Sequence, residues 1–518
     1  MSRMNRVPLL LVVLSLAFLF VAGCGGGIST TNPMPAGFSN SSLNGTFAFA
    51  ISGENSGGFF TVAGSFQANG SGTISSGVVD INSPGTIGSI PNVPITGTYA
   101  VRSDGRTTAA ITAATNPPLS FGLDFVLLNS QKGLMIRFDN NATASGSIDQ
   151  QSSTAFNLTS LAGTFAFTVS GVDSTVNQFP EASAGLLTLD ASGNITSGRF
   201  DDNHASTGTA PTTVNTNLAI APSVAGFSAP ASGTGRGTVA FTSPVTSATV
   251  HFAYYVVDAT HLKLIQVDAA PILSGDAFRQ STTALTPLSG PLAFTMAGST
   301  LTGAIHNAFV AGGILNTDGA GHIQNTSLTD LDNGGAVTPS GGAATAGVYA
   351  VSSNGRGTMQ LTGPATLNLV FYPSTGGLLL FEADTSVVAS GTALAQSGGP
   401  FSNSSITNAF GLNFSGVVNP GTINAAEIDA ISQFSASGSG SLNGAMDINN
   451  FGSLFNSLAL SGNYSVASNG RGTATLKTSV GNFNIIFYMA STSSVVFIEI
   501  DESASGQITA GVFATQTH

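Results

Sequence analysis

Tryptophan is absent from this chain, cysteine occurs once, and charged residues make up only 7% of its 518 residues. A single cysteine excludes any disulfide within the chain, so its domains must be stabilised by the burial of apolar side chains. Only 13 Lys and Arg stand against 25 Asp and Glu, which gives a net charge of −12. Because binding to phosphates needs clustered cations, nucleic acid is not an expected partner.

Glycine and apolar residues are abundant instead. The chain has 64 Gly and 42% hydrophobic residues, which is too apolar for an acidic disordered protein. Small and hydroxyl-bearing residues in place of Lys and Glu predict strands and turns rather than helices. Since single cores rarely grow beyond about 250 to 300 residues, the chain is long enough for more than two domains.

The N-terminus has the form of an export signal. Arg3 and Arg6 precede an apolar run from 8 to 22, which is shorter than the roughly 20 residues of a membrane span. The stretch Val21-Ala22-Gly23-Cys24 resembles the lipobox of bacterial lipoproteins. That resemblance implies cleavage after residue 23 and acylation of Cys24.

Residues 1–23 are therefore expected to be a signal peptide and residues 24–40 a flexible tether to a lipid-anchored protein of the cell envelope. The glycine after Cys24 favours the outer membrane, by the sorting habits of that family. A plain signal peptide or an uncleaved anchor is the alternative.

Four copies of one unit follow the tether. The openings GTFAFAISG at 45, GTFAFTVSG at 163, GPLAFTMAG at 290 and NAFGLNFSG at 408 are spaced by 118, 127 and 118 residues. Each unit closes on a glutamine: Gln151, Gln280, Gln396 and Gln516. We expect β-domains at 41–152, 158–282, 286–398 and 402–518.

Each unit has room for eight short strands with tight turns such as SNGR and SDGR between them. Short connections force neighbouring strands antiparallel, and an eight-stranded up-and-down barrel leaves no free edge. We therefore predict an all-β protein of four tandem antiparallel barrels. The units are similar to lipocalin and avidin barrels in strand number and length only, because the Trp-bearing lipocalin motif is missing. A β-sandwich is the alternative.

One arginine recurs in the same hairpin of every unit: Arg106, Arg236, Arg356 and Arg471. If Ser468 and Arg471 close the turn as a pair, Arg471 shares a strand face with Tyr464 and Val466. Its stem would then cover these apolar groups while the guanidinium reaches water or a carbonyl group. A ligand-holding role is the alternative. The second copy has a longer turn, so we expect Arg236 to sit differently.

Aspartates recur near the ends of the third and seventh strands. In a meander these ends lie at the mouth opposite the arginine hairpin, so we predict a polarised unit without Arg–Asp pairs. We expect these aspartates to be solvated turn residues. The alternative is that they form a calcium site, although no complete calcium-binding loop is present. The third-strand residues are Asp80, Asp201, Asp330 and Asp447, and the seventh-strand residues are Asp139, Asp268, Asp384 and Asp501.

No catalytic machinery recurs with the repeat. None of the six histidines occupies matching positions in all four units, and His251 and His261 lack a third zinc ligand. No nucleophile elbow or phosphate-binding loop is present. We therefore expect neither enzymatic activity nor a cofactor.

Tandem modules behind a lipid anchor suit a non-catalytic binding, adhesive or structural role toward an unknown surface or envelope partner, through extended, multivalent presentation. The alternative is a carrier of small hydrophobic ligands inside lipocalin-like barrels. Phenylalanine side chains that are predicted to point inward would fill the barrels and leave no room for a ligand. They are Phe47, Phe49, Phe165, Phe167, Phe294, Phe410 and Phe414.

Overall fold

The computed structural model describes residues 37–518 except 86, 175, 206–210, 281–287, 303–304, 339–343, 364–365, 421–424 and 501–505. The predicted signal peptide and most of the predicted tether lie outside these residues. The described part is all-β, with one four-residue α-helix, α1 (Leu158–Leu161), and three 3₁₀ turns at Asn40–Ser42, Ser153–Ala155 and Asn403–Ser405. Within it, no helix has the length and hydrophobicity to cross a membrane.

Barrels 1 and 4 are closed eight-stranded meanders in which every strand pairs with its neighbours in the sequence and the last strand pairs with the first. Both the predicted all-β fold and the up-and-down topology are confirmed, and the sandwich alternative is wrong. Barrel 1 consists of β1 (Asn44–Asn55), β2 (Gly58–Asn69), β3 (Thr73–Ser83), β4 (Gly88–Val101), β5 (Arg106–Ala113), β6 (Leu119–Leu127), β7 (Lys132–Asp139) and β8 (Ala142–Gln150). Barrel 4 consists of β26 (Thr407–Val418), β27 (Ala426–Ser437), β28 (Ser441–Asn450), β29 (Ser453–Val466), β30 (Arg471–Thr478), β31 (Gly481–Met489), β32 (Ser494–Glu499) and β33 (Gln507–Thr515).

Barrel 2 has the same strand order but β12 and β13 do not pair, because an irregular segment joins them through single bridges such as Phe227 with Val239. Its strands are β9 (Gly163–Val172), β10 (Pro180–Leu189), β11 (Ile195–His204), β12 (Thr213–Ile220), β13 (Arg236–Thr242), β14 (Thr249–Asp258), β15 (His261–Gln266) and β16 (Ile272–Arg279).

Barrel 3 closes through the pairing of β18 with β19 and carries the short β20 beside β19. Its strands are β17 (Ser289–Thr302), β18 (Ile305–Asp318), β19 (His322–Asn333), β20 (Ala336–Thr338), β21 (Thr345–Val351), β22 (Gly357–Thr362), β23 (Leu367–Ser374), β24 (Gly377–Glu382) and β25 (Val387–Ala395).

Alternation along the strands separates an inner from an outer face. Phe47, Phe49 and Ile51 lie in the core of barrel 1, whereas Ala48 between them packs on the outer face against Tyr255 of barrel 2. The phenylalanines predicted to point inward are all buried in the barrel cores. The outer faces carry apolar residues too, and this allows barrels to pack on one another.

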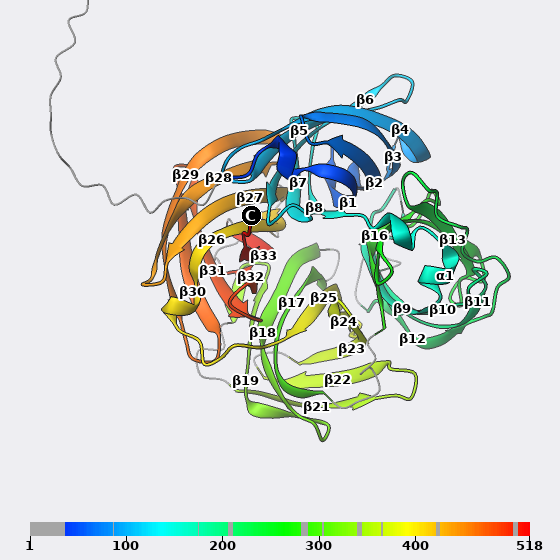
Figure 1. Ribbon diagram of the computed structural model, residues 1–518. Coiled ribbons are helices and arrows are strands. Elements are labelled where there is room, and N and C mark those ends of the chain that lie inside the picture. The colour runs from blue at the N-terminus through cyan, green and yellow to red at the C-terminus, as the bar shows by residue number, and fades with distance from the viewer. Residues whose placement is uncertain are drawn as a thin grey trace, which may run out of the picture. The chain divides into compact units, whose positions relative to one another are not determined.

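The four barrels form a closed cycle (Figure 1). Strands of barrel 1 contact barrel 2, barrel 2 contacts barrel 3, barrel 3 contacts barrel 4, and β26 and β27 of barrel 4 contact β7 and β8 of barrel 1. Each barrel uses one surface to contact the barrel before it and a different surface to contact the barrel after it. This is a head-to-tail arrangement, and it closes after four units. The expectation of an extended array is therefore wrong for the described residues, which form one compact unit.

Candidate functional site

The recurring arginine follows a three-residue loop, not the two-residue loop that the sequence suggested. In barrel 4 the backbone N–H of Ala467 donates to the carbonyl of Arg471, and Gly470 takes the left-handed conformation at φ 88°. Arg471 is therefore opposite Ala467, and this one-residue shift turns its side chain to the outer face. Tyr464 points into the core, so the prediction that Arg471 covers Tyr464 is wrong.

Each arginine forms an ion pair with the third-strand aspartate of a neighbouring barrel. Arg236, Arg356 and Arg471 bind their partners through both Nε and Nη2, with the shortest contacts between 2.6 and 2.8 Å. The predicted reach of the guanidinium toward water is wrong, whereas the predicted separation of each arginine from the third-strand aspartate of its own barrel is confirmed. The pairs are Arg236–Asp80, Arg356–Asp201, Arg471–Asp330 and Arg106–Asp447. Despite its longer turn, Arg236 makes the same contact as the others.

We call these four contact regions joint 1/2, joint 2/3, joint 3/4 and joint 4/1, after the barrels that they connect. In the first three, a buried tyrosine on the strand beside the arginine donates a further hydrogen bond to the same aspartate: Tyr255, Tyr372 and Tyr488. Burial and then the aspartate charge raise the pKa of these phenols well above the usual value, so they stay protonated donors. Burial alone would lower the pKa of the arginines, but the paired aspartates raise the pKa of Arg236 and Arg356 above the usual value.

Amide side chains complete the joints: a closing glutamine in all four, and an asparagine in joints 1/2, 2/3 and 4/1, whereas Asp332 stands at the asparagine position of joint 3/4. Two residues after the aspartate, Asn82, Asn203 and Asn449 each donate to backbone carbonyls at the end of the seventh strand of the next barrel, at 2.8 to 3.3 Å. The four closing glutamines donate to the turn before the arginine of the next barrel: Gln151 to Thr234, Gln280 to Asn354, Gln396 to Asn469 and Gln516 to Asp104. The asparagines were missed by sequence reasoning, although their fixed spacing from the aspartates could have revealed them.

The seventh-strand aspartates do not join the third-strand ones. Asp139 is paired with Arg137, Asp268 with His251, and Asp384 accepts from Asn368. Asp501 lies outside the described residues. Within the described part of the chain, no three His, Cys, Asp or Glu side chains come close enough to hold a metal ion. The predicted acidic cluster is therefore wrong for these residues.

The two histidines that were judged insufficient for a zinc site, His251 and His261, have separate partners. His251 pairs with Asp268, and His261 pairs with Asp276 and stacks on Phe278. Near His261, the fully buried Lys263 of barrel 2 binds Asp149 of barrel 1 at 2.8 Å, which adds a second ion pair to joint 1/2.

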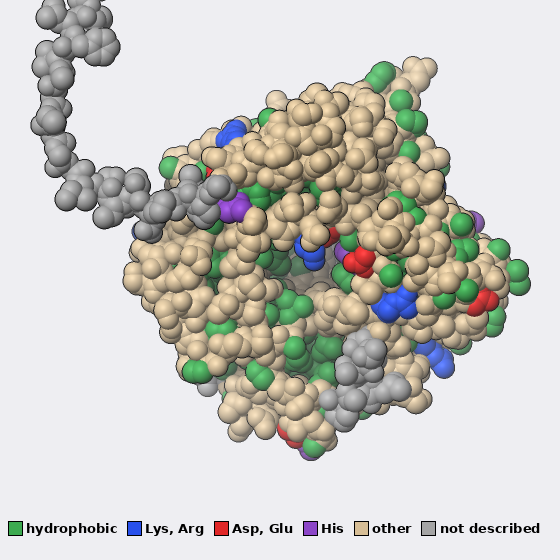
Figure 2. Space-filling view, viewed as in Figure 1, with side chains coloured by type: hydrophobic (Ala, Val, Ile, Leu, Met, Phe, Trp, Pro, Cys, Tyr) green, Lys and Arg blue, Asp and Glu red, His purple; other side chains and the backbone are tan. Residues whose placement is uncertain are grey.

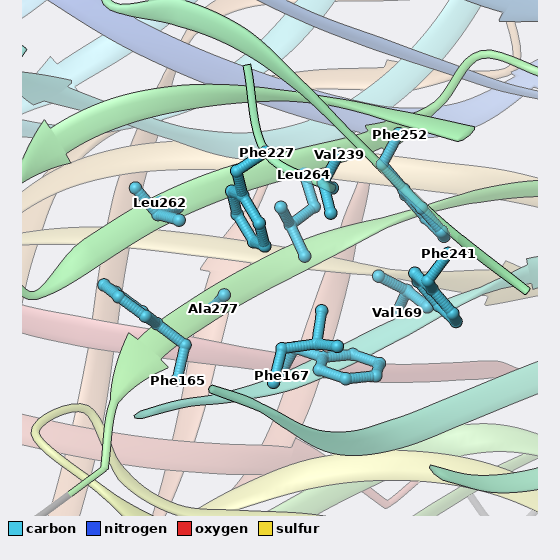
Figure 3. Close-up of a pocket in the computed structure, with 11 residues that line it drawn as sticks. Phe165, Phe167, Val169, Phe227, Val239, Phe241, Phe252, Leu262, Leu264 and Ala277 are labelled. Atoms are coloured by element: carbon cyan, nitrogen blue, oxygen red, sulfur yellow. The ribbon is translucent and has the colours of Figure 1, made fainter. Parts of the chain in front are cut away.

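The interior of barrel 2 holds only a small cavity of about 20 Å³, lined by side chains such as Phe165, Phe167 and Phe227. Figure 3 shows these side chains gathered around one space inside the barrel. A cavity in barrel 4 measures about 10 Å³. Ligand pockets occupy roughly 300 to 1,000 Å³, so these two interiors are too full for a carried ligand.

A larger pocket of about 380 Å³ lies where barrels 1, 2 and 3 meet. Figure 2 shows one face of the molecule hollowed near the centre of the ring. Apart from backbone and small residues, the pocket wall carries the carboxyl groups of Glu54 and Glu181, the amide of Gln178, the ring of Phe59, and the hydroxyls of Ser52, Ser170, Ser299 and Ser390. We call it the central pocket.

Contacts between barrels fix the wall of the central pocket. The side chain of Gln178 accepts from the backbone N–H of Phe59 at 2.8 Å and donates to the carbonyl of Gly57. Gly171 has no side chain, and a Cβ there would collide with the carbonyl of Ile272 and with the Phe59 ring. A glycine at this position therefore allows the ring to lie against barrel 2.

The two carboxyl groups of the central pocket have raised pKa values. Burial raises the pKa of Glu181 to about 8, with the charge of Asp202 adding to the shift, and burial also raises the pKa of Glu54. Among the described residues, no Lys or Arg lines the pocket. The wall thus offers hydroxyls, an amide and the protonated carboxyl group of Glu181, all of which can donate and accept hydrogen bonds.

No family model matches the chain, and no curated protein sequence matches it. Solved structures of transferrin-binding protein B show a faint likeness. The protein from Haemophilus parasuis is 10% identical over 74% of this chain and 82% of its own, with a TM-score of 0.19. The protein from serogroup B Neisseria meningitidis is 9% identical over 74% and 84%, with a TM-score of 0.21. At such scores the likeness carries no argument, and the fold rests on the strand pairing alone.

Proposed function

We propose that this protein is a lipid-anchored, non-catalytic binding protein of the bacterial cell envelope, and that its binding site is the central pocket of the ring. The anchor follows from the lipobox-like stretch ending in Cys24 and favours the outer membrane. The ring then acts as a rigid platform at the end of the tether.

One observation carries this proposal: the recurring arginines, aspartates and glutamines of the chain are used in the joints, whereas the central pocket is an open space whose carboxyl groups and aromatic ring do not recur with the repeat. The arginines, aspartates and glutamines of the repeat hold barrel to barrel, so their recurrence reflects construction. The central pocket, in contrast, gathers Glu54, Glu181 and Phe59 from two barrels around about 380 Å³.

The chemistry of the wall favours a neutral, hydroxyl-rich ligand such as a saccharide. The protonated carboxyl group of Glu181 and serine hydroxyls satisfy sugar hydroxyls in both directions, and an aromatic ring stacks on the apolar face of a sugar. A fully anionic ligand would meet no cation in the pocket. Transport of a hydrophobic ligand is not favoured, because the two measured interiors are nearly filled.

The binding proposal is tested by screening the full chain against neutral and charged glycans and measuring the best ligand by calorimetry. We expect Phe59→Ala to weaken binding of a neutral saccharide at least tenfold, with Phe451→Ala, which changes a ring that is 43% exposed and outside the pocket, as the matched control. Binding that is equal in both variants, or no saccharide binding at all, would refute the proposed ligand class.

The anchor has its own test. A fatty-acid probe should label the wild-type chain in cells and fail to label Cys24→Ala. Equal labelling of the two proteins would refute the anchor and would leave the binding proposal standing.

A further inference from the structure

Joint 4/1 differs from the other three because no linker crosses it. Residues 151–162 connect barrels 1 and 2, and residues 396–406 connect barrels 3 and 4. At joint 4/1 the last residues of barrel 4 contact barrel 1. The N–H of Thr517 donates to the carbonyl of Leu128, and His518 packs edge-on against Phe38. Within the described part of the chain, the contacts that close the ring here are non-covalent.

These contacts are also weaker than elsewhere. Arg106 directs Nε to Asp104 of its own turn and reaches Asp447 only through Nη1 at 3.1 Å, whereas the other arginines are bidentate. Val126 stands where Tyr255, Tyr372 and Tyr488 stand in the other barrels, so no phenol supports the pair.

The apolar contact is smaller as well. At joint 4/1 the fully buried apolar residues are Val126, Ile136 and Ile431. The corresponding clusters at joints 2/3 and 3/4 include larger sets with Tyr372, Phe381, Tyr488 and Ile498. Less apolar surface is buried away from water at this joint, so burial stabilises it less.

Carboxyl groups that form no ion pair with the described residues gather at the same joint. Asp124, which is 4% exposed, occupies the position of Ala253 in barrel 2 and Ile486 in barrel 4. Across the interface, Asp429 of barrel 4 is fully buried and accepts from the hydroxyl of Thr143 of barrel 1 at 2.5 Å. Next to Asp429, Glu427 and Glu54 lie within reach of each other's backbone N–H groups.

Few charged groups surround these carboxyl groups. Asp124 on β6 faces Asp447 of β28 and two cations, Arg102 and Arg106. Arg106 is already paired with Asp447, and Arg102 donates to Ser457. Asp429 on β27 faces Glu54 of β1, Glu427 of β27 and the hydroxyls of Thr143 on β8 and Ser415 on β26, with no cation among these groups.

We propose that joint 4/1 is an acid-stabilised latch: the ring is closed at low pH and opens first at this joint as Asp124, Glu427 and Asp429 ionise. The barrels themselves stay folded, and opening exposes the faces of barrels 1 and 4 that the latch covers.

The direction follows from proton linkage. Burial raises the pKa of Asp124 and of Asp429 from 3.8 to about 7, and the charges of Asp447 and of Glu54, respectively, add to it. The pKa of Glu427 is raised well above its usual value. The closed ring therefore binds more protons than the open one, so closure is complete below about pH 4 and weakens as the pH rises toward about 7. Each carboxyl group changes the ratio of closed to open by up to about tenfold per pH unit in that window.

Hydrogen exchange of the full chain tests the latch with internal controls. The amide of Thr517 bonds across joint 4/1, and the equivalent amides of Ser152 and Ser397 bond across joints 1/2 and 3/4. After correction for intrinsic exchange, we expect the protection of Thr517 relative to Ser397 to fall at least tenfold from about pH 5 to about pH 8. Solution X-ray scattering should show a larger radius of gyration at the higher pH.

The variant Asp124→Ala, which installs the residue of barrel 2, combined with Asp429→Asn, should flatten this pH dependence. If that double variant fails to fold, Asp124→Ala alone should reduce it. The proposal would be overturned if the protection of Thr517 relative to Ser397 did not change with pH in the wild type. It would also be overturned if this relative protection fell equally in the variants. A radius of gyration that stays constant while Thr517 loses protection would show fraying of the last residues and would likewise overturn it.

Discussion

Replacing Arg356 with methionine should destabilise joint 2/3 more than any single exposed substitution. Its partner Asp201 is fully buried and accepts from Nε at 2.9 Å, from Nη2 at 2.6 Å, from the phenol of Tyr372, and from the N–H of Asn217 at 2.8 Å. Without the guanidinium, a carboxylate stays buried with no countercharge. Breaking one side of such a pair costs about 3 to 5 kcal/mol, and the two remaining donors place the expected loss near the lower end.

The assay is urea unfolding followed by tyrosine fluorescence, since the chain has seven Tyr and no Trp. The double variant Arg356→Met with Asp201→Asn should recover part of the loss, and a double-mutant cycle should give a coupling of at least about 1.5 kcal/mol. Lys477→Met, at an exposed position, is the control and should change stability by less than about 0.5 kcal/mol. A cycle with no coupling would refute the reasoning that these ion pairs hold the barrels together.

Three further outcomes are expected. Gln516→Ala removes two hydrogen bonds to barrel 1, to the carbonyls of Asp104 and Leu127, and should cost about 1 to 3 kcal/mol in the same urea assay; no loss would show that this amide is dispensable. Gly146→Ala places a Cβ against a backbone carbonyl of β1, whereas Gly481→Ala meets nothing within 4 Å, so thermal melting should fall for the first and stay nearly constant for the second. Burial and then the charge of Asp384 raise the pKa of Glu382 to about 9, so the folded state binds its proton more tightly than the unfolded state. Melting of the wild type should therefore decline with rising pH from about 5 to 9, more steeply than melting of Glu382→Gln.

The barrels could be predicted from the sequence because each unit carries its own strand alternation and turn chemistry. Closure of eight antiparallel strands follows from those local signals, and the inward phenylalanines follow from the period of two. The hairpin loop was misjudged by one residue: the loop glycine, Gly470, adopts the left-handed conformation of a three-residue loop, and this turns Arg471 from the inner to the outer face.

The joints could not be derived from one unit alone. Topology correctly separates Arg471 from Asp447 within barrel 4, but Arg471 binds Asp330, which is 141 residues away in barrel 3. Such pairing depends on how whole barrels pack, and this is a property of outer faces that local patterns do not describe. The repeated spacing of aspartate and asparagine, as in Asp447 and Asn449, was the signal in the sequence that pointed to a shared docking element.

The cyclic order of the four barrels has a consequence for their order along the polypeptide. Since the two ends of the folded part meet at joint 4/1, where Phe38 contacts His518, connecting them and cutting the chain at 396–406 would yield a circular permutant that starts with barrel 4. Such a permutant needs no new interface, because every barrel keeps both of its neighbours. The position of the N-terminal end could thus be moved from one barrel to another around an unchanged ring.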